Sequence, residues 1–371
     1  MSMENTKYHL GEVVINYDRL RKPLSSMQRE SFKGDYPYYG AQGIIDFVAE
    51  YRCDGEYLLI AEDGENLSSR NEPIAQIARG RFWVNNHAHI VTNNELSDMQ
   101  YLCYLLNSSD IAGYVTGSAQ PKLSQTNLNK IVISLPPLPV QQKIASILST
   151  YDTLIENNTK RIRLLEQMAE NLYKEWFVRF RFPGHENVEM ERGVPKGWSI
   201  AKLKEIVKRL PFNRTYKEFE LKQEGNVIVI DQSTKGYLGF HNNEPSHIAT
   251  LDAPIIIFGD HSCKFQLMIK NFSLGENVIP FVSNDEERTN RYYLFYATHK
   301  LIETEEYKRH WGRLMAMKVL IPNIKLQQEF SEIIKIMEND KEYLQRQIAL
   351  LTKQRDLLLP RLMSGKLEVK P

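Results

Sequence analysis

One segment of this sequence occurs twice, and that repeat restricts the possible folds more than any other feature. Leu135-Pro-Pro-Leu-Pro-Val-Gln-Gln142 returns 186 residues later as Ile321-Pro-Asn-Ile-Lys-Leu-Gln-Gln328, and the offset holds without a gap for more than thirty residues. A fainter echo links Leu10-Gly-Glu-Val13 to Leu203-Lys-Glu-Ile206. Because a duplicated chain folds as repeated units of the same topology, we expect a pseudo-twofold internal repeat.

Each copy of the repeat continues into a long segment whose apolar residues alternate in steps of four and three. This 3.5-residue period keeps one stripe of a helix facing a partner helix and implies a left-handed supercoil. Neither helix buries its stripe alone, so we expect the two to pack as an antiparallel coiled coil. Its predicted seam comprises Ile144, Leu148, Tyr151, Ile155, Asn158, Ile162, Leu165, Leu172 and Trp176 in the first copy and Phe330, Ile334, Met337, Leu344, Ile348, Leu351, Leu358 and Leu362 in the second. The polar seam residues Asn158, Lys341 and Arg355 either fix the register or lie at frayed or water-filled stretches.

The segments outside the helices contain short strand-like and helix-like runs. β-branched and aromatic residues at Tyr57–Ile60, Val227–Ile230 and Ile255–Phe258 predict strands. Apolar spacing predicts helices at Asp98–Asn107 and Tyr292–His299. We therefore expect an α+β fold in which two globular units are separated by the coiled coil. The predicted division is a first globular domain at 1–143, a spacer helix at 144–182, a second globular domain at 183–329 and a C-terminal spacer helix at 330–371.

Composition excludes several classes of protein. With 47 Lys and Arg against 46 Asp and Glu, the 371-residue chain has no cation excess of the kind that a histone-like or polybasic DNA binder carries. No apolar run approaches the roughly 20 residues that cross a bilayer. The polar N-terminus lacks a secretory pattern, and three scattered cysteines, Cys53, Cys103 and Cys263, indicate a reducing compartment without disulfides. We expect a cytoplasmic protein that contacts no membrane.

The motifs of common enzymatic chemistry are missing from the sequence. It has no Gly-x4-Gly-Lys-Ser/Thr loop, no Gly-x-Gly-x-x-Gly turn after a strand and no Asn/Asp-Pro-Pro-aromatic methyltransferase motif. Glu306-Tyr307-Lys308 has the Glu-x-Lys spacing of many nucleases, but we interpret it as a solvated helix face. His87-Ala-His89 and His261-Ser-Cys263 offer two ligands each, whereas a structural zinc needs four. We expect neither catalysis nor a metal site in this chain.

Several motifs taken together resemble one family. They are the Leu-Pro-Pro-Leu-Pro-x-Gln-Gln turn before a long helix, Gly117–Ser124 ahead of that turn, Val194-Pro-Lys-Gly-Trp198, and Leu358-Leu-Pro-Arg-Leu-Met-Ser-Gly-Lys-Leu367. In this ordered duplication the chain is similar, over almost its whole length, to the specificity (S) subunits of type I restriction–modification enzymes. The second unit departs from the pattern, because His310-Trp-Gly-Arg-Leu-Met-Ala316 stands where the first unit has Gly117–Ser124.

The resemblance implies a division of labour between subunits. Each globular unit is then a target recognition domain that reads one half of a split, asymmetric site in double-stranded DNA, and the helical spacer docks two modification (methyltransferase) subunits. Restriction subunits join them to give an ATP-dependent nuclease. The family's S subunit is non-catalytic and holds no cofactor, so S-adenosylmethionine, ATP and Mg²⁺ are expected only in the partner subunits.

We expect DNA contacts from side chains in or near loops that can pair with base edges, as Arg does with guanine and Gln with adenine. The candidates are Tyr39, Gln42, Arg70, Arg79, Arg81, Gln120 and Lys122 in the first unit and Lys264, Arg288, Arg291, Trp311 and Arg313 in the second. For each, the alternative is an ordinary surface residue or a salt bridge. Residues 1–143 hold 13 basic and 16 acidic residues and residues 183–329 hold 20 and 19. Because the units are nearly neutral, we expect the modification subunits to supply much of the phosphate contact.

Two other classes of function stay open at this point. A stand-alone nuclease or methyltransferase would cleave or methylate DNA as the purified chain alone. A coiled-coil scaffold without a DNA function would leave the methylated sequence unaltered when either globular unit is changed.

Overall fold

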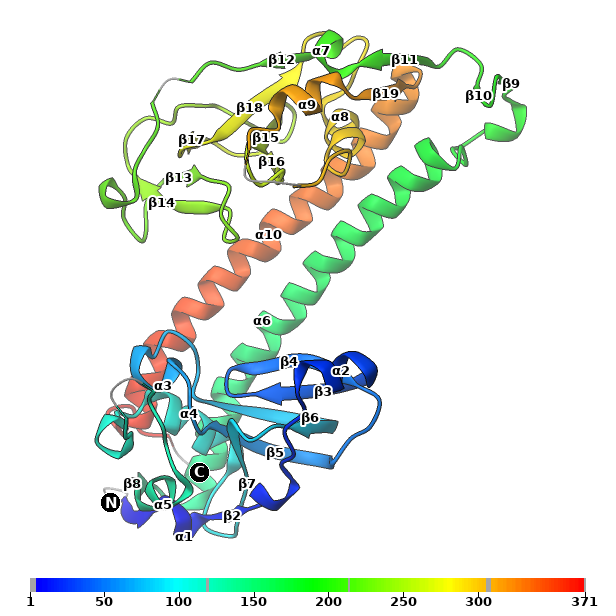
Figure 1. The fold of residues 1–371 in the computed structure, drawn as a ribbon. Helices are drawn as coiled ribbons and strands as arrows, with labels where there is room; N and C mark the ends of the chain where they lie inside the picture. The colour runs from blue at the N-terminus through cyan, green and yellow to red at the C-terminus, as the bar shows by residue number, and fades with distance from the viewer. Residues whose placement is uncertain (1–4, 118–119, 213, 305–307, 370–371) are drawn as a thin grey trace. The chain divides into compact units, whose positions relative to one another are not determined.

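The computed structural model describes residues 5–117, 120–212, 214–304 and 308–369. Contacts divide the chain into two compact units, residues 1–157 with 348–371 and residues 158–347. Each unit holds one sheet-rich domain and part of both long helices, α6 (Leu138–Tyr173) and α10 (Ile324–Met363), which Figure 1 shows. The predicted mixed fold of two sheet-rich domains joined by two long helices is confirmed. The predicted functional division at 143, 182 and 329 stays a prediction.

The two long helices pack antiparallel. In the first unit Arg355 Nη1 donates to Asp152 Oδ1 over 2.7 Å, and in the second unit Lys341 Nζ lies 3.2 Å from Glu166 Oε1. Residue numbers therefore rise along α6 as they fall along α10. This agrees with the direction that the pseudo-twofold repeat predicts.

The predicted seam positions are shielded from water along both helices. Each of them is buried or half-buried. The polar seam residue Asn158 is buried, and its amide donates to Gln347 Oε1 over 3.1 Å. Apolar residues off the stripe, such as Leu164 and Leu350, are more than half exposed. Burial therefore follows the 3.5-residue period read from the sequence.

The sheet of the first unit has six strands in the order β2-β7-β5-β6-β3-β4. They are β2 (Val14–Asn16), β3 (Lys33–Gly40), β4 (Gly43–Val48), β5 (Cys53–Ala61), β6 (Ala75–Val84) and β7 (Ala88–Asn93). All neighbours run antiparallel except β3 and β6, which are parallel.

The second unit keeps this order in two pieces, β12-β18-β15-β16 and β14-β13-β17. Its strands are β12 (Val207–Arg209), β13 (Val227–Ile230), β14 (Tyr237–His241), β15 (Ile255–Gly259), β16 (Phe265–Met268), β17 (Phe272–Leu274) and β18 (Val278–Ser283). The parallel neighbours are here β13 and β17. All three strand-like runs predicted from the sequence lie in strands, namely in β5, β13 and β15.

Short elements complete both units. The helices are α1 (Leu10–Val13), α2 (Ser26–Ser31), α3 (Asn66–Ser69), α4 (Met99–Ser108), α5 (Gln125–Lys130), α7 (Leu203–Ile206), α8 (Arg291–Thr298) and α9 (Trp311–Ala316). Antiparallel strand pairs join β1 (Thr6–His9) to β8 (Val132–Leu135), β11 (Ser199–Lys202) to β19 (Lys318–Ile321), and β9 (Met190–Glu191) to β10 (Val194–Pro195). Single turns of 3₁₀-helix, η1 (Asp18–Leu20), η2 (Ala112–Tyr114), η4 (His185–Asn187) and η5 (Glu218–Glu220), and a π-helical turn, η3 (Lys174–Val178), complete the set.

The repeated Gln-Gln motif anchors a helix start in each unit. The fully buried Gln141 accepts from the N–H of Asp98, the N-cap of α4, over 3.0 Å and donates to two backbone carbonyls. Gln327 makes the corresponding three bonds around Asn290, the N-cap of α8. One buried side chain thus satisfies three backbone groups that would otherwise be unpaired. The motif recurs in the sequence because both units need this link between a long helix and the sheet domain.

Candidate nucleic-acid interface

Four loops of the first unit meet where β5 ends and β7 begins. The N–H of Glu62, after β5, donates to the carbonyl of His87 over 2.9 Å, and the N–H of Leu123 donates to the carbonyl of Glu62 over 2.7 Å. The N–H of Asn85 donates to the Tyr39 carbonyl over 3.0 Å, which adds the β3–β4 hairpin. We name the residues of these loops the first loop cluster: 41–42, 62–65, 85–87 and 120–122.

A shallow hollow of about 440 Å³ lies in the first loop cluster. The exposed Gln120 lines it. Charges around it are paired, since His87 Nδ1 lies 2.8 Å from the Asp63 carboxylate and Lys122 Nζ lies 3.2 Å from Glu62. The lining of the hollow offers the Gln120 amide and the His87 imidazole beside the carboxylates of Asp63 and Glu65. That combination suits hydrogen bonding to a flat polar edge more than attraction to phosphate.

Beneath the cluster, the fully buried His89 connects three elements. Its Nδ1 lies 2.7 Å from Asp18 Oδ2, and its Nε2 lies 2.8 Å from the carbonyl of Leu123. Arg21 pairs with Asp18, at 3.1 Å, and with Glu62. Hydrogen bonds to charged groups are stronger than neutral ones, so this network holds residues 122–123 against the sheet.

The network sets the ionisation of its two carboxyls. Burial raises the pKa of Asp18, but hydrogen bonds from His89 and from the N–H of Ile90, with the charges of His89 and Arg21, lower it more, and the net pKa lies below the ordinary 3.8. Burial likewise raises the pKa of Glu62, and the neighbouring Arg21, His89 and Lys122 bring it below the ordinary 4.5. Both carboxylates are therefore charged at neutral pH.

The second unit builds the same junction of loops. The N–H of Asp260, after β15, donates to the carbonyl of Asn277 over 2.9 Å, and the N–H of Gly275 donates to the carbonyl of Ile230 over 2.8 Å. They are equivalent, through the repeat, to the bond from Glu62 to His87 and the bond from Asn85 to Tyr39 in the first unit. We name the residues of these loops the second loop cluster: 231–236, 260–264, 275–277 and 308–310.

The side chains of the second loop cluster are different. Gln232 Oε1 accepts from the N–H groups of His261 and Ser262 at 3.0 and 3.3 Å. Lys264 Nζ donates to the carbonyl of Ser233 over 2.8 Å. A second hollow, of about 430 Å³, lies beside Gln232. One backbone frame thus presents two unlike sets of polar groups.

Four of the seven first-unit candidates lie in or beside the first loop cluster. Gln42 is exposed at the tip of the β3–β4 hairpin, and Gln120 and Lys122 lie on the adjoining segment. The half-buried ring of Tyr39 packs edge-on against Phe82, with 5.4 Å between ring centroids. Burial raises the pKa of Tyr39, so it is an uncharged neighbour of the cluster.

The three arginine candidates of the first unit lie elsewhere. Arg70 donates to three backbone carbonyls at the C-terminal end of α4 at 2.9 to 3.1 Å. Arg79 lies 2.7 Å from Glu56 and Arg81 lies 3.1 Å from Asp54, across the β5–β6 ladder. Their place as DNA contacts stays a prediction, and the structure puts them outside the first loop cluster.

In the second unit Lys264 lies in the second loop cluster, and Trp311 lies beside it, because its backbone N–H donates to Asp260 Oδ1 over 2.9 Å. Trp311 packs between two buried phenylalanine rings at centroid distances of 6.0 and 5.5 Å. Arg291 pairs with a neighbouring carboxylate, Arg313 donates to a backbone carbonyl over 3.3 Å, and Arg288 is exposed. The predicted candidates are therefore not gathered in one place in this unit.

The sequence interpretation did not include Asp63, Gln232 or Lys235, which the loop clusters bring forward. Gln232 and Lys235 lie in the loop between β13 and β14. Asp63 could have been found from the loop that follows a strand in both copies of the repeat. Asp54–Glu62 corresponds to Asp252–Asp260 at an offset of 198, which places the two loops after β5 and β15 in register. Loops at equivalent positions with different side chains are the expected place for two different specificities.

The short ligand-like motifs do not converge. His87 faces Asp63, whereas His89 faces Asp18. Within the described ranges, no group of three or more His, Cys, Asp and Glu side chains is arranged to hold a metal ion. Positions 306 and 307 of the Glu-x-Lys triplet lie outside the described residues. Among the helices that the structure describes, none has the length and apolarity that a bilayer-spanning segment requires.

Comparison with known proteins yields one consistent group. Residues 3–167 match the family model described as type I restriction modification DNA specificity domain. The MjaIX type I restriction enzyme specificity subunit of Methanocaldococcus jannaschii is 25% identical over 393 residues, covering 93% of this chain and 90% of that protein. The Haemophilus influenzae specificity subunit candidate S.HindORF215P is 40% identical over 145 residues, 39% of this chain. This match spans only 37% of the Haemophilus protein.

The fold has a solved counterpart. The crystal structure of the S subunit of a type I restriction–modification system from M. genitalium aligns with 97% of this chain and 96% of its own, at a TM-score of 0.67. Sequence identity in this alignment is 17%, so it is the fold that the two chains share.

Proposed function

This chain belongs to the specificity subunits of type I restriction–modification systems, and on that premise we propose that its two loop clusters read the two halves of a split DNA site. A specificity subunit is non-catalytic within its complex. The observation that carries the proposal is the junction of loops built twice on one hydrogen-bond frame with different side chains. Because the side chains differ, the two half-sites differ in sequence.

The exposed groups of the clusters have the chemistry of base-edge readers. A glutamine amide such as that of Gln42 or Gln120 can donate and accept at once, as adenine requires, and an ammonium such as that of Lys264 can donate to guanine O6 and N7. Each good pair contributes about 1–3 kcal/mol of discrimination against the wrong base. We assign the residues 1–143 to one half-site and the residues 183–329 to the other.

The helical spacer is the proposed docking site for two modification subunits. Along α10, the exposed apolar side chains Ile336, Tyr343, Leu350 and Leu357 recur every seven residues, each more than half exposed. Exposed apolar stripes of this kind favour association with another protein. The modification subunits would supply S-adenosylmethionine chemistry and phosphate contacts, and restriction subunits would add ATP- and Mg²⁺-dependent cleavage in the cytoplasm. Typical members of this family bind no cofactor themselves.

Methylome sequencing of a host that carries this chain with its modification subunit tests the proposed readers. We expect a split, asymmetric methylated motif. Gln120→Ala should relax one half of it and Lys264→Ala the other, each by the roughly 5- to 150-fold that one lost base pairing implies. Lys130→Ala on α5 and Lys204→Ala on α7, exposed cations that are not among the candidate DNA contacts, serve as controls outside the clusters and should leave both halves intact.

The same experiment separates the competing classes. If the methylated DNA motif is unchanged by substitutions in both loop clusters, only the scaffold class remains. Methylation or cleavage of DNA by the purified chain alone would show that the chain is itself an enzyme and not a specificity subunit. A change of both half-sites by a single cluster variant would overturn the assignment of one cluster to one half.

Tyr343→Glu and Leu350→Glu test the docking stripe. Either substitution should abolish co-purification of the modification subunit, because a charge then replaces an apolar contact. Asn339→Glu, at an exposed polar position on α10, is the control. Equal co-purification of all three variants would refute this surface as the docking site.

A further inference from the structure

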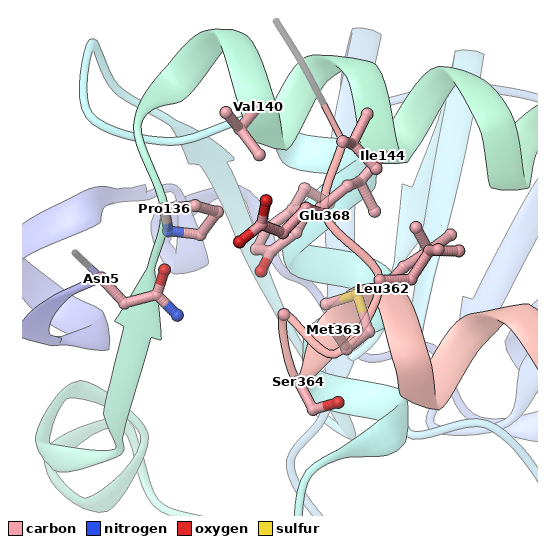
Figure 2. A pocket seen from close by; sticks show the side chains of 12 residues that line it. Asn5, Pro136, Val140, Ile144, Leu362, Met363, Ser364 and Glu368 are labelled. Carbon is pink, nitrogen blue, oxygen red and sulfur yellow. The ribbon is translucent and has the colours of Figure 1, made fainter. Parts of the chain in front are cut away.

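A pocket of about 230 Å³ opens in the first unit where the residues after α10 lie against the start of α6. In Figure 2, Pro136, Val140 and Ile144 lie on one side and Leu362 and Met363 on the other. Val140, Ile144 and Leu362 are all buried, so the floor is apolar. An apolar cavity of about 150 Å³ is enough to hold a benzene ring. The pocket therefore has room for one aromatic side chain.

The second unit shows what fills the equivalent place. The repeat offset of 186 puts Phe330 where the first unit has Ile144 and Phe177 where it has Met363. Phe177 packs on Phe330 with 5.1 Å between centroids and on Trp198 with 6.0 Å. The pocket of the first unit thus occupies the place that an aromatic cluster fills in the second unit.

The residues at the mouth differ in the same way. Asn5 precedes β1 as Trp198 precedes β11, and Glu368 stands at the repeat position of Phe182. In the second unit Phe182 stacks on Trp198 with 5.6 Å between centroids. Asn5 and Glu368 are exposed in the first unit. Two rings that close the site in one unit are replaced in the other by an amide and a carboxylate.

A tyrosine at the bottom of each site points to the same difference. Tyr293 donates its hydroxyl to the carbonyl of Leu320 over 2.6 Å. Its counterpart Tyr101 is buried and lines the pocket, and the described part of the chain provides no hydrogen-bond acceptor for its hydroxyl. Burial raises the pKa of Tyr101 to about 12, so this hydroxyl stays a neutral donor.

We propose that this pocket receives an aromatic side chain of a partner protein, with a Lys or Arg next to that side chain paired with Glu368. The apolar floor fits the ring, and the carboxylate at the mouth selects the cation beside it. In the second unit the rings belong to the polypeptide itself, at Phe177, Phe182 and Trp198. This favours a protein segment over a free small molecule as the occupant of the pocket. The proposal rests on the assembly with other subunits proposed above.

Filling the pocket with the second unit's own residues tests the proposal. The variant Asn5→Trp/Glu368→Phe should fold with an unfolding temperature at least equal to that of the wild type, because added rings replace empty space. Its affinity for the modification subunit should fall at least tenfold. Glu72→Phe, at an exposed loop position of the same unit, controls for added surface hydrophobicity and should bind normally.

A second variant covers the case in which the double substitution impairs folding. Glu368→Lys changes only an exposed charge, and we expect it to weaken binding several-fold and to reverse the salt dependence of that contact. If the wild-type chain binds no modification subunit, the proposed assembly fails. If the wild-type, filled and Glu368→Lys chains bind equally well, assembly stands and the pocket proposal fails.

A photo-crosslinking benzophenone side chain at position 5 identifies the occupant in the full complex. Mass spectrometry should find the crosslink on a partner segment with an aromatic residue within two positions of a Lys or Arg. A crosslink to a second copy of this chain, or to a segment without an aromatic residue, would overturn the proposal.

Discussion

The two sheet-rich domains share one strand order but differ in the strand at their centre. In the first unit β6 is continuous, pairing with β5 over its first part and with β3 over its end. In the second unit the same positions form two strands, β16 on β15 and β17 on β13. The paired residues still match, since Tyr57 faces Ala78 as Ile255 faces Met268. Three residues, 269–271, separate the two strands where β6 has Arg79–Arg81.

Pro254 gives the physical reason for the break. Strand β5 starts at Cys53, and its first four residues pair with Phe82 to Arg79 of β6, whereas β15 starts at Ile255, directly after Pro254. A proline has no N–H to give to a ladder and fixes φ, so the pairing stops there. The junction of loops survives this change. The comparison teaches that the fold preserves the hydrogen bonds that position the loop clusters and tolerates change in the ladder between them.

The largest expected effect concerns another difference between the units, because the second unit has an aromatic cluster where the first unit has a pocket. Phe330→Ala should destabilise the second unit by about 4 kcal/mol, in the upper range for a buried ring, because Phe330 packs against Trp176, Phe177 and Tyr296. Ile144→Ala, its counterpart, should cost about 2 kcal/mol because a pocket already borders that side chain. Urea unfolding followed by hydrogen exchange in each unit measures both. Equal losses would contradict the contrast.

The buried glutamines should cost the same in both units. Gln141→Leu and Gln327→Leu each leave buried backbone groups without a partner, and we expect about 3 kcal/mol of destabilisation from either. The neighbouring Gln142→Leu and Gln328→Leu are matched controls, because both side chains are exposed, and should change stability by less than about 0.5 kcal/mol. Thermal unfolding of the four variants decides this. Unequal effects of the buried pair would show that the two anchors are not equivalent.

The sequence predicted those features that depend on period and repetition. The alternation of four and three residues located both long helices and the buried stripe on each, since burial of a helix face leaves a periodic trace. Hydrophobic runs located β5, β13 and β15. The ends of the helices were less well determined. Pro139 lies in the first turn of α6, where its missing N–H has no partner to lose.

The loop clusters could be predicted only in part. Gln42, Gln120, Lys122 and Lys264, chosen from residue type and loop context, lie in the loop clusters, and their contact with DNA stays a prediction. Arg70, in contrast, reads as a loop cation but donates to the carbonyls that end α4. Which cations are satisfied by the chain's own backbone depends on tertiary contacts, and no local sequence pattern records them. The pocket escaped prediction for the same reason, because it exists only where two distant segments meet.

Acid should weaken the first unit more than the second at the loop junction. Asp18 and Glu62 have lowered pKa values in the folded chain, so their contribution is complete above the ordinary values of 3.8 and 4.5 and is lost as the pH falls below them. At the repeat positions of Asp18 and His89 the second unit has Pro211 and Ile279.

Asp18→Asn tests this difference. The variant should lose about 2 kcal/mol at pH 7, because the buried His89 and Arg21 lose a charged partner. It should then lose less than the wild type between pH 5 and pH 3. Hydrogen exchange of each unit across this range provides the measurement, and an acid response confined to the second unit would contradict the assignment.

The smallest effect concerns the polar residues of the helix seam. Arg355 pairs with Asp152 in the first unit, and Lys341 lies between Glu166 and Glu338 in the second. The Arg355–Asp152 pair is partly exposed, so water screens it and the expected cost of Arg355→Met is about 0.5 kcal/mol. Lys341→Met should cost more, about 1 kcal/mol, because it leaves the buried carboxylate of Glu338 without its cation. If these residues fix the register of α6 against α10, their loss should also change that register, which the loss of an ordinary surface pair would not do. Disulfide trapping between cysteines introduced at opposed positions of α6 and α10 measures the register. We expect one register in the wild type and additional registers in the variant that carries both Arg355→Met and Lys341→Met. A single register in both proteins would show that these residues do not fix the register.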